Sequence, residues 1–294
     1  MNIDWLYIVE IVLAGLGSGS LLSLTGVAFV LIYKATKVVN LAVGEMLMMG
    51  AYFFLGFVSI SFLPLWAVIV LAILAGGLLG GVVERLLIRP MLGESPISVF
   101  MVTVGLGSVL VGVVQLFWGS DQHTLPAFLP SRPVFLGPAV VAPKIAVSFV
   151  IASILIAFFL VIFRYWRGGV ALRATATDQG AAYSCGINVP RVFSFAWIAA
   201  GMAAAAAGIL IGSIGGLSPV MGVFGLSVLV AVIVGGLDSV LGALIAGLVI
   251  GVVEAVVGAQ FGGEYKLMVT FSILVVMLMI RPYGLFGTTE IERL

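Results

Sequence analysis

Charged residues are scarce in this sequence of 294 residues: 9% are Asp, Glu, Lys or Arg, whereas 63% are hydrophobic. A soluble domain carries about 25% charged residues, so the composition excludes an ordinary soluble fold and indicates a membrane protein. The chain has one cysteine, Cys185, and one histidine, His123. An internal disulfide is therefore impossible, and the three or four ligands of a zinc site are lacking. The net charge is +1 and no basic run is present, so we expect no nucleic-acid partner.

Catalytic and nucleotide-binding motifs are also missing. The segment GLGSGS at 15–20 lacks the Lys-Ser/Thr ending of a phosphate-binding loop and lies within a hydrophobic run. A single histidine gives no His–Ser pair or metal cluster for an intramembrane enzyme. The glycines of VTVGLGS at 102–108 fit close helix packing better than a channel filter. We therefore expect no catalytic residue, no metal and no cofactor in this chain.

Long hydrophobic runs fill most of the sequence, and a bilayer core needs about 20 apolar residues per helix. We expect an all-α fold, a polytopic membrane helix bundle with eight or nine spans, because lipid offers no partners to unpaired backbone groups. Residues 1–294 would form a single transmembrane domain. The seventh run is short and follows the turn-like GGLSPVMG at 215–222, which predicts a re-entrant or broken helix. The candidate spans are 8–32, 41–60, 63–87, 97–118, 144–164, 192–213, 224–237, 239–260 and 266–280.

Basic residues predict the orientation, because cytoplasmic loops carry an excess of Lys and Arg. Nine passes with the N-terminus outside place three of the 13 basic residues outside and the other ten inside. The C-terminus and a loop at about 165–191 are then cytoplasmic, and the loop 119–143 with His123 is external. The external residues are Arg132, Lys144 and Lys266. The cytoplasmic residues are Lys34, Lys37, Arg85, Arg89, Arg164, Arg167, Arg173, Arg191, Arg281 and Arg293.

One polar stretch, RATATDQGAAYSCGINVPRV at 173–192, separates two hydrophobic runs. It predicts a short helix over 178–185, with Thr177 capping its start through the hydroxyl and Asp178 in the first turn. Gly186 would follow with a positive φ, and Pro190 would prevent the helix from continuing.

The expected exposed face of this short helix is small and weakly polar, with Ala181, Ala182 and Cys185 and with Tyr183 nearby. Such a face suits docking into a groove on a partner protein. A helix lying on lipid headgroups is the alternative, although such helices are usually rich in Lys and Arg.

Four stretches, spread over nearly the whole chain, resemble one known family. DQGAAYSCGINVPR at 178–191 is similar to the cytoplasmic coupling loop of ABC-transporter permeases. The other three resemble permeases of the branched-chain amino-acid (Liv-type) ABC importer family, and they occur in family order. They are GSLLSLTGVAFVLIYKATKVVNLAVGEMLMMGAY at 19–52, GGLDSVLGALIAGLVIGVVEA at 235–255 and EYKLMVTFSILVVMLMIRPYGLFG at 264–287.

The resemblance implies a permease subunit of an ATP-driven importer for branched-chain or related small amino acids or amides, located in the bacterial inner membrane. It implies two ATP-binding subunits that bind and hydrolyse ATP, a second permease that is a related but different chain, and an extracytoplasmic solute-binding protein. Alternating access would be driven by the partner ATPases. The implied ATPase-coupling residues are Asp178, Ala181, Ala182, Gly186, Ile187 and Pro190.

Three positions depart from the family pattern. Leu41 and Val43 stand where the family often has Phe and His, and Asp238 stands where it often has Gly. These positions border the expected pathway, so the solute is left open among branched-chain amino acids, amides, urea and other small carboxylic acids.

Two carboxylates, Glu45 and Glu254, are expected inside membrane spans, where an ionised group costs about 2.5–3.5 kcal/mol. With Asn40 and Gly44 they are our candidates for the substrate pathway, and Asn40 could bond across helices or cap the helix start. Each glutamate could instead be protonated and purely structural. A secondary transporter driven by an ion gradient, with both glutamates as proton sites and a broken helix, is the alternative function.

Overall fold

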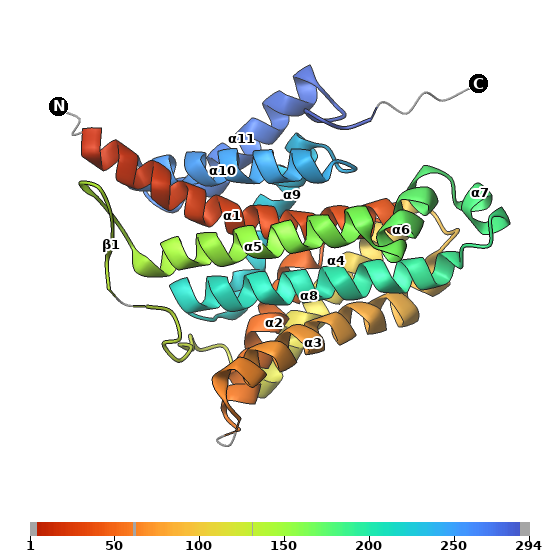
Figure 1. The fold of residues 1–294 in the computed structure, drawn as a ribbon, viewed down its shortest axis with the longest axis horizontal. Helices are drawn as coiled ribbons and strands as arrows, with labels where there is room; N and C mark the ends of the chain where they lie inside the picture. The colour runs from red at the N-terminus through yellow and green to blue at the C-terminus, as the bar shows by residue number, and fades with distance from the viewer. Residues whose placement is uncertain (1–4, 61–62, 131, 289–294) are drawn as a thin grey trace. The chain divides into compact units, whose positions relative to one another are not determined.

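The computed structural model describes residues 5–60, 63–130 and 132–288, which are almost entirely helical (Figure 1). This confirms the all-α, polytopic membrane fold. Arg293, one of the basic residues predicted to be cytoplasmic, lies outside the described residues. Within these described residues, six helices are long and apolar enough to cross a membrane. They are α1 (Trp5–Thr36), α3 (Leu65–Val83) with its continuation, α4 (Pro96–Trp118), α5 (Pro143–Tyr165), α8 (Val189–Gly215) and α10 (Val240–Gln260).

Three shorter apolar helices correspond to the remaining predicted spans. They are α2 (Val43–Val58), α9 (Phe224–Gly235) and α11 (Tyr265–Ile280). The 3₁₀ turn η3 (Pro219–Val223) leads directly into α9, so the seventh predicted segment is a 3₁₀ turn joined to a short α-helix. Pro219 at the start of this turn removes a backbone donor, which explains why a regular α-helix does not begin earlier.

Six further elements of the described residues connect the spans. α3 continues as the π-helical turn η1 (Glu84–Ile88) and the 3₁₀ turn η2 (Arg89–Met91). The hairpin of β1 (Val134–Leu136) and β2 (Ala139–Val141) is antiparallel and pairs Val134 with Val141. Two short helices, α6 (Arg167–Thr177) and α7 (Gln179–Ser184), lie between α5 and α8.

The chain divides into two compact units. The central unit comprises Val27–Pro126 and Ile154–Leu226, and the terminal unit comprises Met1–Gly26, Ala127–Ser153 and Ser227–Leu294. Helices α1 and α5 each contribute one part to either unit.

Small residues bring α2, α3 and α8 of the central unit into close contact, as Figure 1 shows for neighbouring ribbons. A methyl group on Gly76 of α3 would lie 2.8 Å from the carbonyl oxygen of Gly201 in α8. A methyl group on Gly208 of α8 would lie 2.9 Å from the carbonyl carbon of Leu47 in α2. This confirms that such glycines serve helix packing, because only a missing side chain lets the backbones approach so closely.

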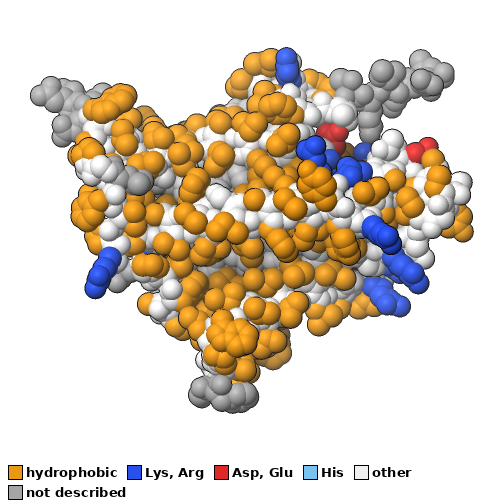
Figure 2. All heavy atoms as spheres, viewed as in Figure 1, with side chains coloured by type: hydrophobic (Ala, Val, Ile, Leu, Met, Phe, Trp, Pro, Cys, Tyr) orange, Lys and Arg blue, Asp and Glu red, His pale blue; other side chains and the backbone are white. Residues whose placement is uncertain are grey.

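In the terminal unit, small residues also bring two helices into close contact. A methyl group on Gly19 of α1 would lie 2.9 Å from the carbonyl oxygen of Gly247 in α10, and the Ser23 hydroxyl donates to the Leu244 carbonyl at 2.8 Å. Large apolar side chains cover the viewed face, with basic groups gathered near the end where α6 and α7 lie (Figure 2). Leu78 of α3, for example, is 70% exposed. Apolar side chains exposed along a whole helix indicate contact with lipid.

Candidate functional site: the Glu45 cradle and the α6–α7 loop

A short turn between α1 and α2 positions the first candidate residues. Asn40 is fully buried, and its Oδ1 accepts from the Ala42 amide at 3.0 Å. The Leu41 amide donates to Thr103 Oγ1 of α4 at 3.2 Å. The expectation that Asn40 caps α2 was wrong, because Ala42 occupies the N-cap position. Asn40 Nδ2 donates to Met46 Sδ of α2 at 3.4 Å, and among the described residues it bonds to no helix other than α2. The short Asn side chain reaches its own backbone two residues on more easily than it reaches a neighbouring helix.

Gly44 and Glu45 follow in the first turn of α2 and face three glycines of the central unit. A methyl group on Gly44 would lie 2.8 Å from Cα of Gly225, so α2 meets the η3–α9 backbone directly. A methyl group on Gly107 of α4 would lie 3.2 Å from the Glu45 carboxyl carbon. One on Gly222 of η3 would lie 3.1 Å from Glu45 Oε1. We call this set, Gly44, Glu45, Gly107, Gly222 and Gly225, the Glu45 cradle.

The Glu45 carboxylate is half-buried, and no other described residue forms a hydrogen bond or ion pair with it. It lies in the first turn of α2, where the helix dipole favours negative charge. Two glycines flank it where side chains would otherwise pack against it. The cradle is therefore able to accept a small cationic group beside the carboxylate.

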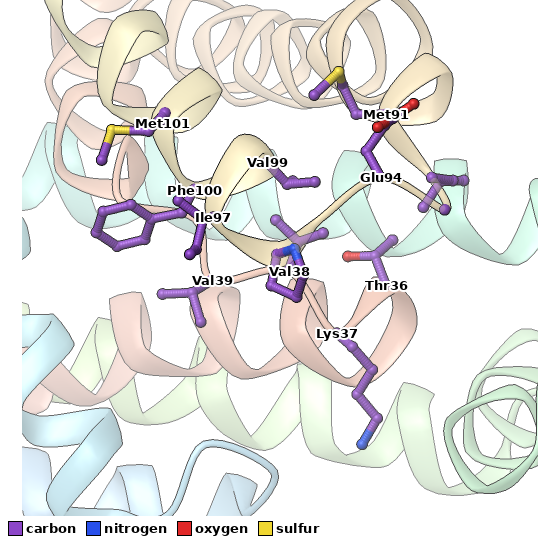
Figure 3. A pocket seen from close by; sticks show the side chains of 13 residues that line it. Thr36, Lys37, Val38, Val39, Met91, Glu94, Ile97, Val99, Phe100 and Met101 are labelled. Carbon is purple, nitrogen blue, oxygen red and sulfur yellow. The ribbon is translucent and has the colours of Figure 1, made fainter.

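An apolar cavity of about 540 Å³ borders the same turn. Thr36, Val38 and Val39 line it from the turn, and Ile97 and Val99 line it from α4 (Figure 3). The turn therefore contacts α4 through the Leu41–Thr103 bond on one part of its surface and borders open space on another.

Glu254 of α10 belongs to the terminal unit and has a different environment. Its Oε1 accepts from the Ser227 hydroxyl at 2.7 Å and from the Thr270 hydroxyl at 2.9 Å. These donors come from α9 and α11, so the carboxyl group ties three helices together. The structure thus brings Asn40, Gly44 and Glu45 together in the central unit, whereas Glu254 belongs to the terminal unit and is hydrogen-bonded there.

The short helix predicted at 178–185 is α7, but its cap differs from the prediction. Asp178 is the N-cap, and its Oδ1 accepts from the Ala181 amide at 2.9 Å. Thr177 ends α6 instead, and its hydroxyl donates to the Arg173 carbonyl at 3.0 Å. The prediction that Thr177 caps the helix was wrong because a separate helix, α6, extends to that residue, and Asp caps as well as Thr.

The end of α7 agrees with the prediction. Gly186 has a φ of +81°, and the Ile187 amide donates to the Ala182 carbonyl at 3.0 Å, which is a Schellman ending. Pro190 lies in the first turn of α8. Of the expected docking face, Ala181, Cys185 and Tyr183 are exposed, but Ala182 is buried. The prediction that Ala182 is exposed was wrong, because the residue is only 4% exposed.

A third carboxylate within a span, Glu84, was missed by the sequence reasoning. It is 1% exposed at the end of α3, where Arg89 binds it with Nε–Oε1 and Nη2–Oε2 distances of 2.9 and 3.1 Å. The Ser194 hydroxyl of α8 also donates to Oε2 at 2.9 Å. The signal that could have found it is an opposite charge five residues away inside one hydrophobic run.

Helices of spanning length, a broken seventh segment and a helical loop between α5 and α8 define a polytopic membrane protein of the permease class. The sequence model of the family described as branched-chain amino acid transport system / permease component matches residues 11–278, and the chain belongs to this family. That confirms the Liv-type resemblance and does not favour the gradient-driven alternative. This is a permease family and not a catalytic one.

Relatives agree with this assignment, and one solved structure shares the fold. The chain is 28% identical to the high-affinity branched-chain amino acid transport system permease protein LivH of Escherichia coli K12, over 100% of both chains. It is 29% identical to the permease protein BraD of Pseudomonas aeruginosa, over 95% of both. Its fold is similar to PsaBC from Streptococcus pneumoniae in complex with Fab, with a TM-score of 0.51, 11% identity and coverage of 93% of this chain and 91% of that one.

Proposed function

We propose that this chain is the permease subunit of an ATP-driven importer for branched-chain or related small amino acids or amides in the bacterial inner membrane. The observation that carries the proposal is α7, a two-turn helix with a cap at each end, set between two long apolar helices. A helix of six residues is marginal in water by itself, so both caps serve to hold it in one conformation. A rigid small helix outside the spans is suited to receive force from a partner.

ATP would be bound and hydrolysed by partner subunits, since no phosphate-binding loop is present in the sequence. With the N-terminus outside and the C-terminus in the cytoplasm, α7 lies on the cytoplasmic side and docks to an ATPase. Ala181 and Tyr183, the latter 72% exposed, form the contact. Two ATPases, a second permease of a related but different sequence, and an external solute-binding protein complete the importer. Gly186, Ile187 and Pro190 set the geometry of the loop, and Ala182 anchors α7 from its buried side.

For an amino-acid solute, the Glu45 cradle is the proposed contact for its ammonium group. All amino-acid solutes carry an ammonium group. The half-buried Glu45 carboxylate, which has no hydrogen-bond partner among the other described residues, attracts such a cation strongly at the reduced dielectric of a helix bundle. Gly107 and Gly222 leave the space beside it. Glu254, which already accepts two hydroxyl bonds, is assigned a structural role in this account.

Copurification with the ATPase subunits tests the proposal. Ala181→Arg introduces a bulky charge on the exposed face of α7, whereas Thr124→Arg introduces the same charge at an exposed position of the 119–143 loop. We expect the wild type and Thr124→Arg to copurify with ATPase subunits from detergent-solubilised membranes and Ala181→Arg to lose them. Retention of the ATPases by Ala181→Arg would contradict docking through α7, and their absence from the wild type would reject the ATP-driven reading.

A further inference from the structure

Close packing leaves α2, α3 and α8 little freedom to slide past one another. A methyl group on Gly80 of α3 would lie 3.0 Å from the carbonyl carbon of Trp197 in α8. One on Gly50 of α2 would overlap the side chain and backbone of Ala205 in α8, with the carbonyl carbon at 3.1 Å. Backbone-to-backbone contact of this kind resists shear, because sliding would drive neighbouring side chains into the opposing helix.

A polar clamp joins α3 and α8 at one end of this packed group. Besides its two bonds to Glu84, Arg89 donates from Nη2 to the Pro190 carbonyl at 3.2 Å and to Ser194 Oγ at 2.7 Å. Ser194 donates in turn to Glu84. We call Glu84, Arg89 and Ser194 the clamp. The clamp binds the start of α8 through Pro190 and Ser194.

The π-helical turn η1 makes the clamp possible. A π-helix brings residues five apart onto the same side, and the Arg89 amide donates to the Glu84 carbonyl across that interval. Such turns are rare and are frequently found at functional sites. Glu84 is buried, whereas the Arg89 side chain is 35% exposed. An ion pair at such a position is weak evidence for stability, and its best-attested use is to fix one arrangement of the elements it joins.

The clamp lies a few residues beyond α7 along the chain. α7 ends at Ser184 and α8 begins at Val189, with Asn188 capping α8 through its side chain. A displacement of α7 therefore moves the first turn of α8. Because α8 is clamped to α3 and packed against α2, a movement of the first turn of α8 is transmitted to α3 and α2. No flexible segment separates these contacts.

We propose that α2, α3 and α8 move as one rigid block during transport, locked by the Glu84–Arg89–Ser194 clamp, and so carry a displacement of α7 to Glu45 in the first turn of α2. Glu84, Arg89 and Ser194 are positioning residues in this scheme. The inference rests on the proposed function in one respect, the docking of a partner ATPase on α7.

A reversible cross-link between α3 and α8 tests whether the block is rigid. A Cβ at position 81 would lie 3.0 Å from Cγ1 of Ile198, so the Cβ atoms of Gly81→Cys and Ile198→Cys fall within about 4.5 Å, the range of disulfides. Cys185→Ser removes the only native thiol. In vesicles containing the whole importer, we expect uptake to be equal before and after oxidation. Uptake that falls on oxidation and returns on reduction would show that α3 and α8 slide, which would overturn the proposal. The single Gly81→Cys variant controls for the oxidant.

The number of solute molecules imported per ATP hydrolysed tests the clamp separately. Ser194→Ala removes the α8 hydroxyl and leaves the Glu84–Arg89 pair, while Ser194→Thr keeps a hydroxyl. We expect Ser194→Ala to hydrolyse ATP at the wild-type rate but to import about tenfold fewer solute molecules per ATP, with Ser194→Thr restoring the ratio. An unchanged ratio in Ser194→Ala would overturn the role of the clamp. If no ATPase copurifies with the wild type, the proposed function fails, whereas copurification together with uptake that falls on oxidation overturns the rigid block alone.

Discussion

Substitution of Gly80 by alanine tests the close packing of α3 against α8, on which the account depends. The new methyl group would overlap the Trp197 carbonyl oxygen, which is backbone and cannot rotate away. Overpacking of this kind costs about 1–3 kcal/mol, and a rigid obstacle places Gly80 near the upper value. The higher helix propensity of alanine offsets about 1 kcal/mol of this cost. The net loss is therefore about 2 kcal/mol, which corresponds to a fall in melting temperature of roughly 4–8 °C.

Gly105 of α4 provides the matched control, because a methyl group there would meet nothing within 4 Å. Gly105→Ala keeps the propensity gain without the overlap, so its melting temperature should equal or exceed that of the wild type. Thermal unfolding of both variants is followed in detergent by size-exclusion chromatography of the monodisperse fraction. Equal melting temperatures for Gly80→Ala and Gly105→Ala would refute the direct backbone contact between α3 and α8.

Three further predictions concern single groups. Glu45→Gln should lower solute uptake by about 10- to 100-fold through loss of one charge-assisted contact, whereas Glu254→Gln should stay near wild type; equal uptake by both would contradict the cradle. Tyr52→Phe should leave the melting temperature unchanged or higher, since the buried Tyr52 hydroxyl has no partner among the described residues. Gly186→Ala should destabilise α7 by about 1–2 kcal/mol because its φ is positive, which faster proteolysis of the 178–192 loop would reveal.

The helices themselves could be predicted from hydrophobic runs, because a membrane imposes one length and one kind of secondary structure on every span. The break before α9 was also predictable, since Pro219 follows two glycines and a serine in GGLSPVMG. The caps of α7 were only partly predictable. Its Gly186 ending was predicted, but two adjacent capping residues, Thr177 and Asp178, could not be told apart without knowing where α6 ends.

The candidate site was harder to predict than the helices, because it depends on contacts between residues that are distant in the sequence. Asn40, Gly44 and Glu45 were found because they lie within six residues of one motif, NLAVGE at 40–45. Gly107 and Gly222, which complete the cradle, come from distant segments. From the sequence alone, these glycines could equally well be helix-packing residues. Glu84 was missed because its neutralising partner follows five residues later, a spacing that brings charges together in a π-turn but not in an α-helix.

The most direct measurement of the central claim is uptake of labelled leucine by vesicles that contain the reconstituted importer, with the solute-binding protein outside. ATP trapped on the ATPase side should drive uptake by the wild type without an ion gradient, and Ala181→Arg should abolish it. Uptake driven by a proton or sodium gradient in the absence of ATP, and insensitive to Ala181→Arg, would contradict coupling through α7.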